Sequence, residues 1–194
     1  MINTHNGVRE KGIKPIDIED YPAIKKHLDT HLPELEKRLD KGITPYNLRN
    51  CAYMEDFYKQ KIVYPNMTKY MPFLFDSHSH FYTNDKGFII TGENIAFLTA
   101  FLNSSLFKYC FIDNFPELQG GTREVRKIFL DKIPVKKIDS KSELKFQEMI
   151  SNLQNLKKEN KETRHLEEEL DKLVFDIYNL SMGERELIGF IEIQ

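Results

Sequence analysis

The sequence predicts an α+β fold: a mixed small sheet with a buried helix, flanked by an N-terminal helix and a helical C-terminal extension. Three observations predict it. Leucine and isoleucine recur at helical spacing from Ile24 to Leu39. Short apolar or aromatic runs, separated by proline, asparagine and glycine, fill residues 52–90 and are typical of strands. Helical spacing returns after Ser140 and continues close to the end of the chain.

The chain opens with a predicted short strand and a glycine-containing loop over Ile2–Gly12. A leading helix follows over about residues 21–41. Asp20 is placed to cap this helix, and Pro22 suits its first turn. Gly42 ends it.

A mixed α/β part is predicted over about residues 52–138. Its strands are expected at Lys61–Tyr64, Met71–Phe75, Phe81–Thr83 and Phe88–Ile90. The segment Asp76–Thr91 resembles a hairpin with its turn at Asn84–Gly87.

The segment Ile95–Lys108 is apolar nearly all the way round, which predicts one helix buried inside the domain. Gly120 and Gly121 then break the chain. Thr122–Ile138 is predicted to be a basic extended segment that ends in a strand and turn at KIPVKKI.

The C-terminal part, residues 139–194, is predicted to be helical. The polar stretch Lys157–His165 leaves two arrangements open: one long helix projecting through solvent, or two helices packed back on each other. Ser181 and Glu184 have the spacing of a capping box, which predicts a last short helix.

The net charge of -2 over 194 residues gives no electrostatic argument for nucleic acid by itself. The charge is unevenly distributed, however. Residues 57–137 carry eleven basic and seven acidic side chains, a local +4, whereas the residues after 137 carry eight basic and thirteen acidic ones, a local -5. A mildly basic middle permits phosphate contacts there and disfavours them in the tail.

Two cysteines, Cys51 and Cys110, stand in apolar or aromatic surroundings, and the N-terminus has no secretory signal pattern. We therefore expect a cytoplasmic protein. The longest apolar run, Ile95–Ile112, is interrupted by polar residues and suits a membrane span poorly, so we expect no membrane partner.

Two histidine pairs have spacings that metal sites use. His27 and His31 are four residues apart on the leading helix, but Leu28 stands where a zinc-binding HExxH motif has its glutamate. His78 and His80 alternate on a predicted strand and would share one face. We favour solvated or DNA-facing histidines over metal ligands at this second pair.

No motif of a catalytic centre is recognisable in the sequence. We find no nucleophile elbow, phosphate-binding loop, dinucleotide-binding loop or paired carboxylates, and no glycine-rich cofactor loop followed by Asn-Pro-Pro-aromatic. Catalytic methyl transfer is therefore not encoded in this chain.

Five segments in order carry a family likeness. They are DYPAIKKHLDTHLPELEKRLDKG at Asp20–Gly42, NLRNCAYMEDFYKQKIVYPNM at Asn47–Met67, FLNSSL at Phe101–Leu106, KIPV at Lys132–Val135 and LDKLVFDIYNLSMGERELI at Leu170–Ile188. Together the chain resembles the TaqI-like C-terminal specificity, or target-recognition, domain of Type IIG restriction-modification DNA methyltransferases.

The resemblance implies sequence-specific recognition of double-stranded DNA by residues 1–138, as the target-recognition part of an adenine methyltransferase. In that family an upstream domain binds S-adenosylmethionine, and some members add a nuclease. We expect no enzymatic activity and no cofactor in this chain by itself. The expected partners are DNA and the methyltransferase or nuclease domains of the same parent polypeptide, and the expected state is a monomer.

The motifs carry over structural roles only. They imply Lys61–Pro65 as a sheet strand, Leu102–Ser104 on the inner helix, and Ile133 with Pro134 closing the domain. DNA reading is expected in the loops Asn66–Tyr70, Ser77–Lys86 and Gly120–Arg126.

Candidate DNA contacts combine basic side chains for phosphates with amide, hydroxyl and aromatic side chains for base edges. The candidates are Lys59, Lys61, Asn66, Thr68, Lys69, Tyr70, His78, His80, Tyr82, Lys86, Thr122, Arg123, Arg126 and Lys127.

Two other functions remain open. The first is a protein-interaction module whose working part is the helices of Ser140–Ile177. The second is a small metal-dependent hydrolase that uses His78 and His80.

Overall fold

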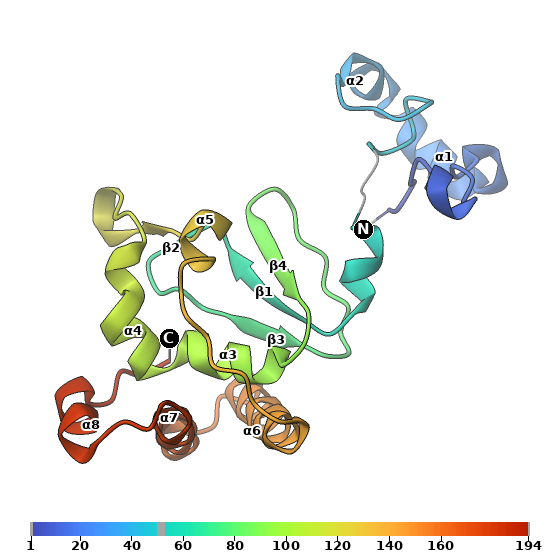
Figure 1. The fold of residues 1–194 in the computed structure, drawn as a ribbon. Coiled ribbons are helices and arrows are strands. Elements are labelled where there is room, and N and C mark those ends of the chain that lie inside the picture. Colours follow the sequence, from blue (N-terminus) through green and yellow to red (C-terminus); the bar gives the residue numbers. More distant parts are fainter. Residues whose placement is uncertain (1, 50–52, 194) are drawn as a thin grey trace. The chain divides into compact units, whose positions relative to one another are not determined.

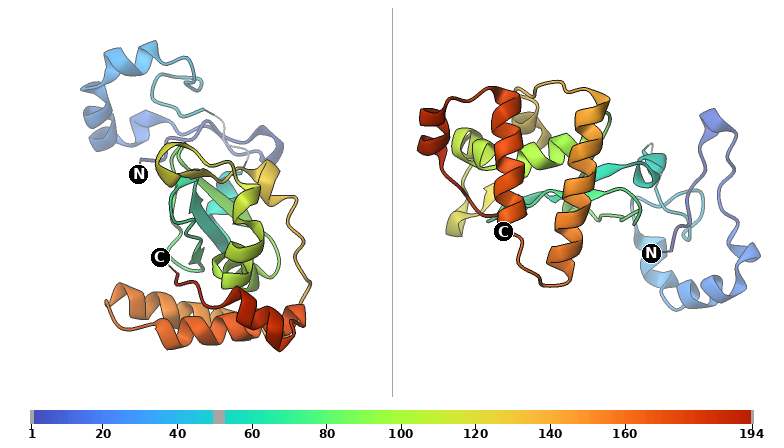
Figure 2. Two further views of the ribbon diagram at one scale, coloured as in Figure 1. Left: turned by 90° about the vertical axis from the view of Figure 1, so that its left-hand side faces the viewer. Right: turned by 90° about the horizontal axis from the view of Figure 1, so that it is seen from below.

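The computed structural model describes residues 2–49 and 53–193 (Figure 1; Figure 2). The chain forms two compact units, Met1–Met54 and Glu55–Gln194. Cys51 lies outside the described residues, so its surroundings stay a prediction. The boundary predicted at residue 138 falls inside the second unit, and the assignment of DNA recognition to residues 1–138 stays a prediction.

The N-terminal unit consists of short helices and loops. Its elements are η1 (Arg9–Lys11), η2 (Ile18–Asp20), α1 (Pro22–Asp29) and α2 (Leu32–Lys37). The single helix predicted over about 21–41 is therefore two helices. Pro33 lies in the first turn of α2 and has no N–H to donate back to the preceding turn, so the first helix stops before it.

Two further expectations for this unit are wrong. No strand forms within Ile2–Gly12 in the described residues; one bridge joins Val8 to Ile13 around η1. Asp20 ends η2 and does not cap α1, whereas the side chain of Asp17 caps η2.

The buried side chain of Asn47 joins the loops of the N-terminal unit. Its Nδ2 donates to the carbonyl oxygen of Ile16 at 2.9 Å, and its Oδ1 accepts from the Thr44 hydroxyl at 2.6 Å. The Asn47 carbonyl oxygen accepts from the Gly42 N–H at 2.9 Å and from Arg38 Nη2 at 3.0 Å. One asparagine thus satisfies backbone groups of segments that form no sheet.

The second unit contains a three-stranded antiparallel sheet with strand order β3-β1-β4. The strands are β1 (Lys61–Pro65), β3 (Leu74–Asp76) and β4 (Gly87–Thr91). A separate two-stranded ladder joins β2 (Met67–Thr68) to β5 (Arg123–Glu124). The predicted strand at Lys61–Pro65 is confirmed, and Ile62 and Tyr64 point from it into the core.

The hairpin predicted over Asp76–Thr91 is wrong, because β1 lies between β3 and β4. The turn itself forms, with Gly87 N–H donating to the Asn84 carbonyl oxygen at 3.2 Å. Phe81–Thr83 is a loop and not a strand, so His78 and His80 share no strand face.

The segment after the glycine pair also differs from the prediction. It contains η5 (Gln119–Gly121), the two-residue strand β5 and the short helix α5 (Lys127–Leu130), and KIPVKKI forms no strand. Ile133 is buried in the core, as expected.

The buried apolar helix is confirmed, but it is broken in two. The parts are α3 (Ile95–Asn103) and α4 (Ser105–Phe111), followed by η4 (Ile112–Asn114). Ser104 adopts an extended conformation between them, and its hydroxyl oxygen accepts from the Phe107 N–H and caps α4. Within the described residues no single helix is long and apolar enough to cross a membrane; α3 with the helix after it, bent by 64°, passes that test only as a pair.

The C-terminal helices are α6 (Ser140–Lys158), α7 (Arg164–Tyr178) and α8 (Met182–Ile188). Of the two arrangements left open, the structure has the packed one: α6 and α7 lie side by side (Figure 2, right). Helix α3 lies between them and the sheet (Figure 1). The apolar faces that motivated a protein-interaction module therefore belong to the core. The predicted capping box at Ser181 and Glu184 is present.

Two amide side chains cap the outer edge of β3 and of Phe73, the residue before it. Asn103 accepts from the Phe73 N–H at 3.2 Å and donates to the Phe73 carbonyl oxygen at 2.8 Å. Gln154 makes the same pair of hydrogen bonds with Phe75, at 2.8 and 2.9 Å. Every second residue of an edge strand points its N–H and its C=O away from the sheet. The helix side chains bind these groups in place of a neighbouring strand.

A buried carboxylate joins α7 to the start of α4. Asp171 accepts from the backbone N–H of Ser105 at 2.8 Å and from the Ser105 hydroxyl. Burial raises the pKa of Asp171, and the hydrogen bonds from Ser105 oppose that shift. The Ser105 oxygen also accepts from the Ile191 N–H at 2.7 Å, so one serine ties α4, α7 and the C-terminal segment together.

Candidate functional site

The three loops predicted to read DNA converge on Asn66, at the end of β1. The Asn66 N–H donates to the Lys86 carbonyl oxygen at 2.8 Å, and its carbonyl oxygen accepts from the Val125 N–H at 2.8 Å. The side-chain oxygen Oδ1 is buried and has no hydrogen-bond partner among the described residues. Segments far apart in the sequence are thus joined through one residue's backbone.

The β2–β5 ladder presents Lys69 and Tyr70 next to the glycine pair. Thr68 Oγ1 accepts from the N–H groups of Tyr70 and Met71, both at 3.1 Å, which makes a tight turn after β2. Tyr70 is 54% exposed, and the Lys69 ammonium lies 5.9 Å from its ring centroid. Gly121 adopts the left-handed conformation, φ +76°, beside the Lys69 side chain, which lies 4.0 Å from where a Cβ would stand.

A second group of predicted residues lies at the Lys61 end of β1, where aromatic side chains pack against one another. The hydroxyl groups of Tyr58 and Tyr82 are 2.6 Å apart and hydrogen-bonded, which raises the pKa of Tyr82 to about 12. The ring of Tyr58 lies 5.9 Å from that of His80, and Tyr82 stacks on the buried ring of Phe57 at 4.9 Å. Four residue steps of about 3.3 Å separate the two ends of β1, about 13 Å in all.

Lys61 does not face solvent. Its ammonium is fully buried and donates to Asp76 Oδ2 at 2.6 Å and to the Phe57 carbonyl oxygen at 2.7 Å. Lys61 and Asp76 are cross-strand partners in the β1–β3 pair, which brings the two charges together. The predicted phosphate contact of Lys61 is wrong for this structure, because a buried ion pair cannot reach a duplex.

Asp76 holds the loop that follows it. Its two carboxylate oxygens accept from the N–H groups of Ser79 at 2.9 Å, His80 at 3.2 Å and Phe81 at 2.7 Å. Burial alone would raise the pKa of Asp76, but the hydrogen bonds from Lys61 and from the loop outweigh burial and lower it. His80 adopts the left-handed conformation, φ +50°, within this turn.

Arg123 is also committed to the fold. Its Nη1 donates to the carbonyl oxygens of Ile112 and Phe115, at 3.1 and 2.8 Å. Its Nη2 pairs with Asp113 and Glu117, and the side chain is only 16% exposed. The guanidinium closes the loop between α4 and β5 and is not available as the predicted phosphate contact.

The other predicted basic residues lie on the surface, mostly next to carboxylates. The ion pairs are Lys59–Asp56, Lys86–Asp85, Arg126–Glu124 and Lys127–Asp131. Exposed pairs of this kind contribute little to stability, so their cations are free to exchange a carboxylate for a phosphate. Of this predicted basic set, Lys69 alone has no carboxylate within 4 Å in the part of the chain described.

The predicted residues therefore fall into two groups and two exceptions. One group surrounds Asn66: Thr68, Lys69, Tyr70, Lys86, Thr122, Arg126 and Lys127. The other lies at the Lys61 end: Lys59, His80 and Tyr82, with the exposed His78 on the same loop. Lys61 and Arg123 are the exceptions, because both are structural.

The sequence-based selection missed three residues of the second group: Tyr58, Asp76 and Phe81. Tyr58 and Phe81 are about half exposed, at 54% and 49%. Asp76 carried a usable signal, because aspartate before Ser-His-Ser is typical of a turn in which the carboxylate accepts from following N–H groups.

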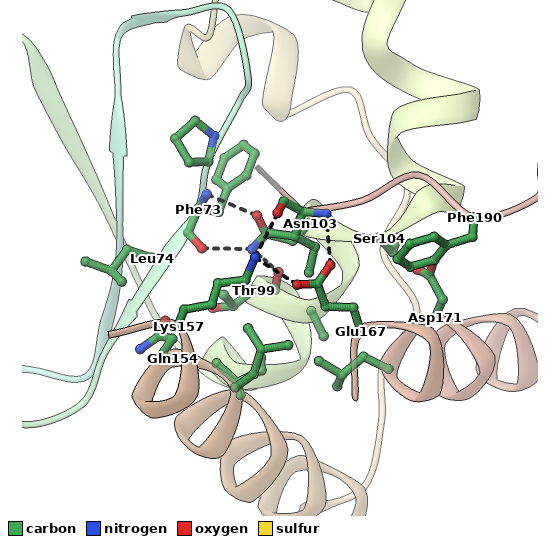
Figure 3. Close-up of a pocket in the computed structure, with 16 residues that line it drawn as sticks. Phe73, Leu74, Thr99, Asn103, Ser104, Gln154, Lys157, Glu167, Asp171 and Phe190 are labelled. Atoms are coloured by element: carbon green, nitrogen blue, oxygen red, sulfur yellow. Dashed lines mark hydrogen bonds and ion pairs between the residues drawn. The ribbon is translucent and has the colours of Figure 1, made fainter. Parts of the chain in front are cut away.

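A small cavity of about 140 Å³ lies inside the second unit, between β3, α3, α6 and α7 (Figure 3). The polar side chains that line it already have partners within the protein. Lys157 pairs with Glu167 at 2.8 Å, and Asn103 binds the backbone of Phe73. Burial raises the pKa of Glu167, but the hydrogen bonds from Lys157 and Thr163 outweigh it and lower the pKa. We assign these groups to the core and not to a ligand site.

The described residues contain no group of three or more histidine, cysteine, aspartate or glutamate side chains placed to hold a metal ion. His27 and His31 lie 5.4 Å apart between ring centroids, edge to face, at a surface helix junction. The structure thus offers no support for a metal-dependent hydrolase at His78 and His80.

Loops that carry hydroxyl, amide, aromatic and basic side chains, mounted at both ends of a small sheet, are the features of an α+β recognition domain. The chain matches the family described as the TaqI-like C-terminal specificity domain over residues 13–135, and it belongs to this family. Membership indicates a role in DNA recognition within restriction-modification systems. The match ends before α6, so the likeness noted at Leu170–Ile188 lies outside it.

Proposed function

We propose that this chain recognises a specific sequence in double-stranded DNA, as the target-recognition part of a restriction-modification adenine methyltransferase. The family match together with the convergence of three polar loops on Asn66 carries the proposal. The mechanism is binding and not catalysis. Any S-adenosylmethionine site belongs to a methyltransferase domain outside this chain.

The group around Asn66 supplies the chemistry that a duplex requires. Lys69, Arg126 and Lys127 are exposed cations for phosphate oxygens. Thr68 and Thr122 add hydroxyl groups to this group of residues, and the Thr68 hydroxyl, whose oxygen accepts from two N–H groups, retains its O–H as a donor to base edges. A good bidentate contact discriminates between bases by about 1–3 kcal/mol, so a few contacts suffice for selectivity.

The expected partners are DNA and the methyltransferase or nuclease domains of the same parent polypeptide, and we propose a monomeric, cytoplasmic chain. The packing of the apolar faces of α6 and α7 onto α3 supports the monomer. Light scattering on the purified chain tests it, because a dimer at micromolar concentration contradicts the proposal.

The function is tested by selecting duplexes from a randomised pool with the full 194-residue chain. We expect enrichment of a defined sequence and an affinity that falls linearly with log salt, by about 0.9 log units per phosphate contact. The variant Lys69→Ala/Arg126→Ala/Lys127→Ala should bind more weakly, with a shallower salt dependence. The variant Lys172→Ala, in the acidic tail, serves as the control. Absence of any enriched sequence contradicts the proposed function.

A further inference from the structure

The buried Lys61–Asp76 pair connects two segments that carry exposed aromatic side chains. Lys61 binds the carbonyl oxygen of Phe57, which precedes Tyr58 at the end of η3 (Met54–Tyr58). Asp76 binds three consecutive N–H groups of the loop Ser79–Phe81. One ion pair thus sets the position of η3 relative to this loop.

The acceptor positions of Asp76 are used for this purpose. The Asp76 carboxylate accepts four hydrogen bonds, one from Lys61 and three from the loop. A buried charge pair costs desolvation free energy, and an apolar pair of similar volume would satisfy a core as well. A core requirement therefore does not account for the pair. The three loop N–H groups do, because they and Lys61 require two acceptor oxygens, which a carboxylate has and an amide side chain lacks.

The loop presents its side chains outward from this anchor. His80, Phe81 and Tyr58 are exposed, and the ring of Tyr58 contacts those of His80 and Tyr82. In the hydrogen bond between Tyr58 and Tyr82 one hydroxyl donates to the other, so the pair retains one O–H donor for a ligand. The result is a preorganised surface with aromatic faces, an imidazole and a hydroxyl donor, all of which suit base edges and sugars.

We propose that Lys61 and Asp76 are positioning residues for sequence discrimination, acting through His80 and Tyr58, which contact the duplex. This inference rests on the proposed DNA recognition. Lys61 then has a different role from the predicted phosphate contact: it contributes to specificity without touching DNA, from inside the protein. The group around Asn66 then supplies affinity, and the Lys61 end supplies part of the discrimination.

The test compares Asp76→Asn with a matched control, Asp56→Asn. Both substitutions neutralise the partner of a lysine, but the Lys59–Asp56 pair is exposed and binds no loop. The probes are the duplex enriched by selection from a randomised pool and poly(dI-dC). Hydrogen exchange at the N–H groups of Ser79, His80 and Phe81 reports on the loop.

For Asp76→Asn we expect a cooperative unfolding transition and exchange at the three N–H groups faster by at least about tenfold. The preference for the selected duplex over poly(dI-dC) should fall by roughly five- to fiftyfold, with little change in affinity for poly(dI-dC). Asp56→Asn should change neither the exchange at the three N–H groups nor the preference for the selected duplex. An Asp76→Asn variant that keeps its preference while its loop exchanges faster overturns the inference, and so does unchanged exchange.

Two variants that leave the ion pair intact keep the test valid if Asp76→Asn fails to fold. Tyr58→Phe and His80→Ala should lower the preference for the selected duplex without lowering the thermal midpoint. Wild-type preference in both variants overturns the inference while the proposed function stands. A wild-type chain without preference among duplexes overturns the proposed function and this inference together.

Discussion

The replacement Asn103→Leu should destabilise the second unit by removing the cap of its edge strand. Asn103 is buried and makes three hydrogen bonds, two with the backbone of Phe73 and one with the Thr99 carbonyl oxygen. Thr99 is four residues earlier in α3, so its carbonyl keeps a helical partner after the replacement. Phe73 loses the partner of both its N–H and its C=O.

The magnitude follows from these two groups. A buried backbone group left without a partner costs about 1–3 kcal/mol, so the pair costs about 2–6 kcal/mol. Leucine has the same number and branching of side-chain heavy atoms as asparagine, so the replacement leaves no cavity. The loss is a large share of the 5–15 kcal/mol that stabilises a typical domain.

The assay is urea unfolding of the full chain followed by far-ultraviolet circular dichroism, with linear extrapolation to water. Two controls isolate the cause. Gln154→Leu removes an equivalent pair of bonds with Phe75 at a half-buried site, where water replaces part of the loss, so we expect a smaller effect. Asn155→Leu alters an exposed amide next to it and should change stability by less than about 0.5 kcal/mol. A loss below about 1 kcal/mol for Asn103→Leu refutes the capping argument.

Three further predictions concern pH, salt and the N-terminal unit. Burial raises the pKa of Asp171 above 3.8, so the native state holds this proton more tightly than the unfolded state does. The free energy of unfolding of the wild type, minus that of Asp171→Asn, should therefore decrease as the pH rises through the raised pKa. Urea unfolding from about pH 4 to pH 7 measures it. Lys69→Ala should reduce the slope of log affinity against log salt by about 0.9, whereas Lys172→Ala should not, measured by fluorescence polarisation with a labelled duplex. Gly42→Ala should loosen the N-terminal unit, because its Cβ would lie 2.7 Å from the Cβ of Asn47; we expect about 1–3 kcal/mol, measured as faster proteolysis within residues 2–49.

Each of these predictions has a result that contradicts it. A constant stability difference across the pH range shows that Asp171 is not held with a raised pKa in the native state. An unchanged salt slope removes Lys69 from the phosphate contacts. Unchanged proteolysis of the Gly42→Ala variant shows that its loop shifts freely and that the Asn47 hydrogen bonds do not determine the packing.

Patterns that report burial were reliable guides to the fold. The short apolar run at Lys61–Tyr64 and the longer one after Ile95 correspond to β1 and α3, because both patterns follow from which side chains leave water. The capping box at Ser181 formed because its hydrogen bonds are local. These features require no knowledge of distant parts of the chain.

Features that depend on distant pairing could not be read from the sequence. The Asn84–Gly87 turn formed as expected, yet β4 pairs with β1, because strand order depends on tertiary pairing and not on turn chemistry alone. The break at Ser104 did carry a local signal, since Asn-Ser-Ser is rich in capping residues, but continuous apolarity on both sides concealed it.

For the charged residues predicted to contact DNA, too, local signals were reliable and distant pairings could not be read from the sequence. A lysine at the start of a strand reads as an exposed cation, and only the register of β1 against β3 places Asp76 beside Lys61. Arg123 likewise became structural through carbonyl groups of Ile112 and Phe115, which no pattern near it announces. Lys69 remained a candidate because its turn is formed locally by Thr68.

Five buried polar residues in the segments that carry the family likeness have a common role. Asn47, Lys61, Asn103, Ser105 and Asp171 are all buried, and each binds backbone groups or a buried partner where irregular segments meet. A small sheet with short strands leaves many backbone groups without ladder partners, so the fold requires side chains that supply them. These five residues are internal supports of the fold. It follows that substitution of the exposed His80 should change which DNA is bound, and substitution of the exposed Lys69 should change how tightly DNA is bound, both without unfolding the domain. Substitution of the five buried residues should instead destabilise the fold.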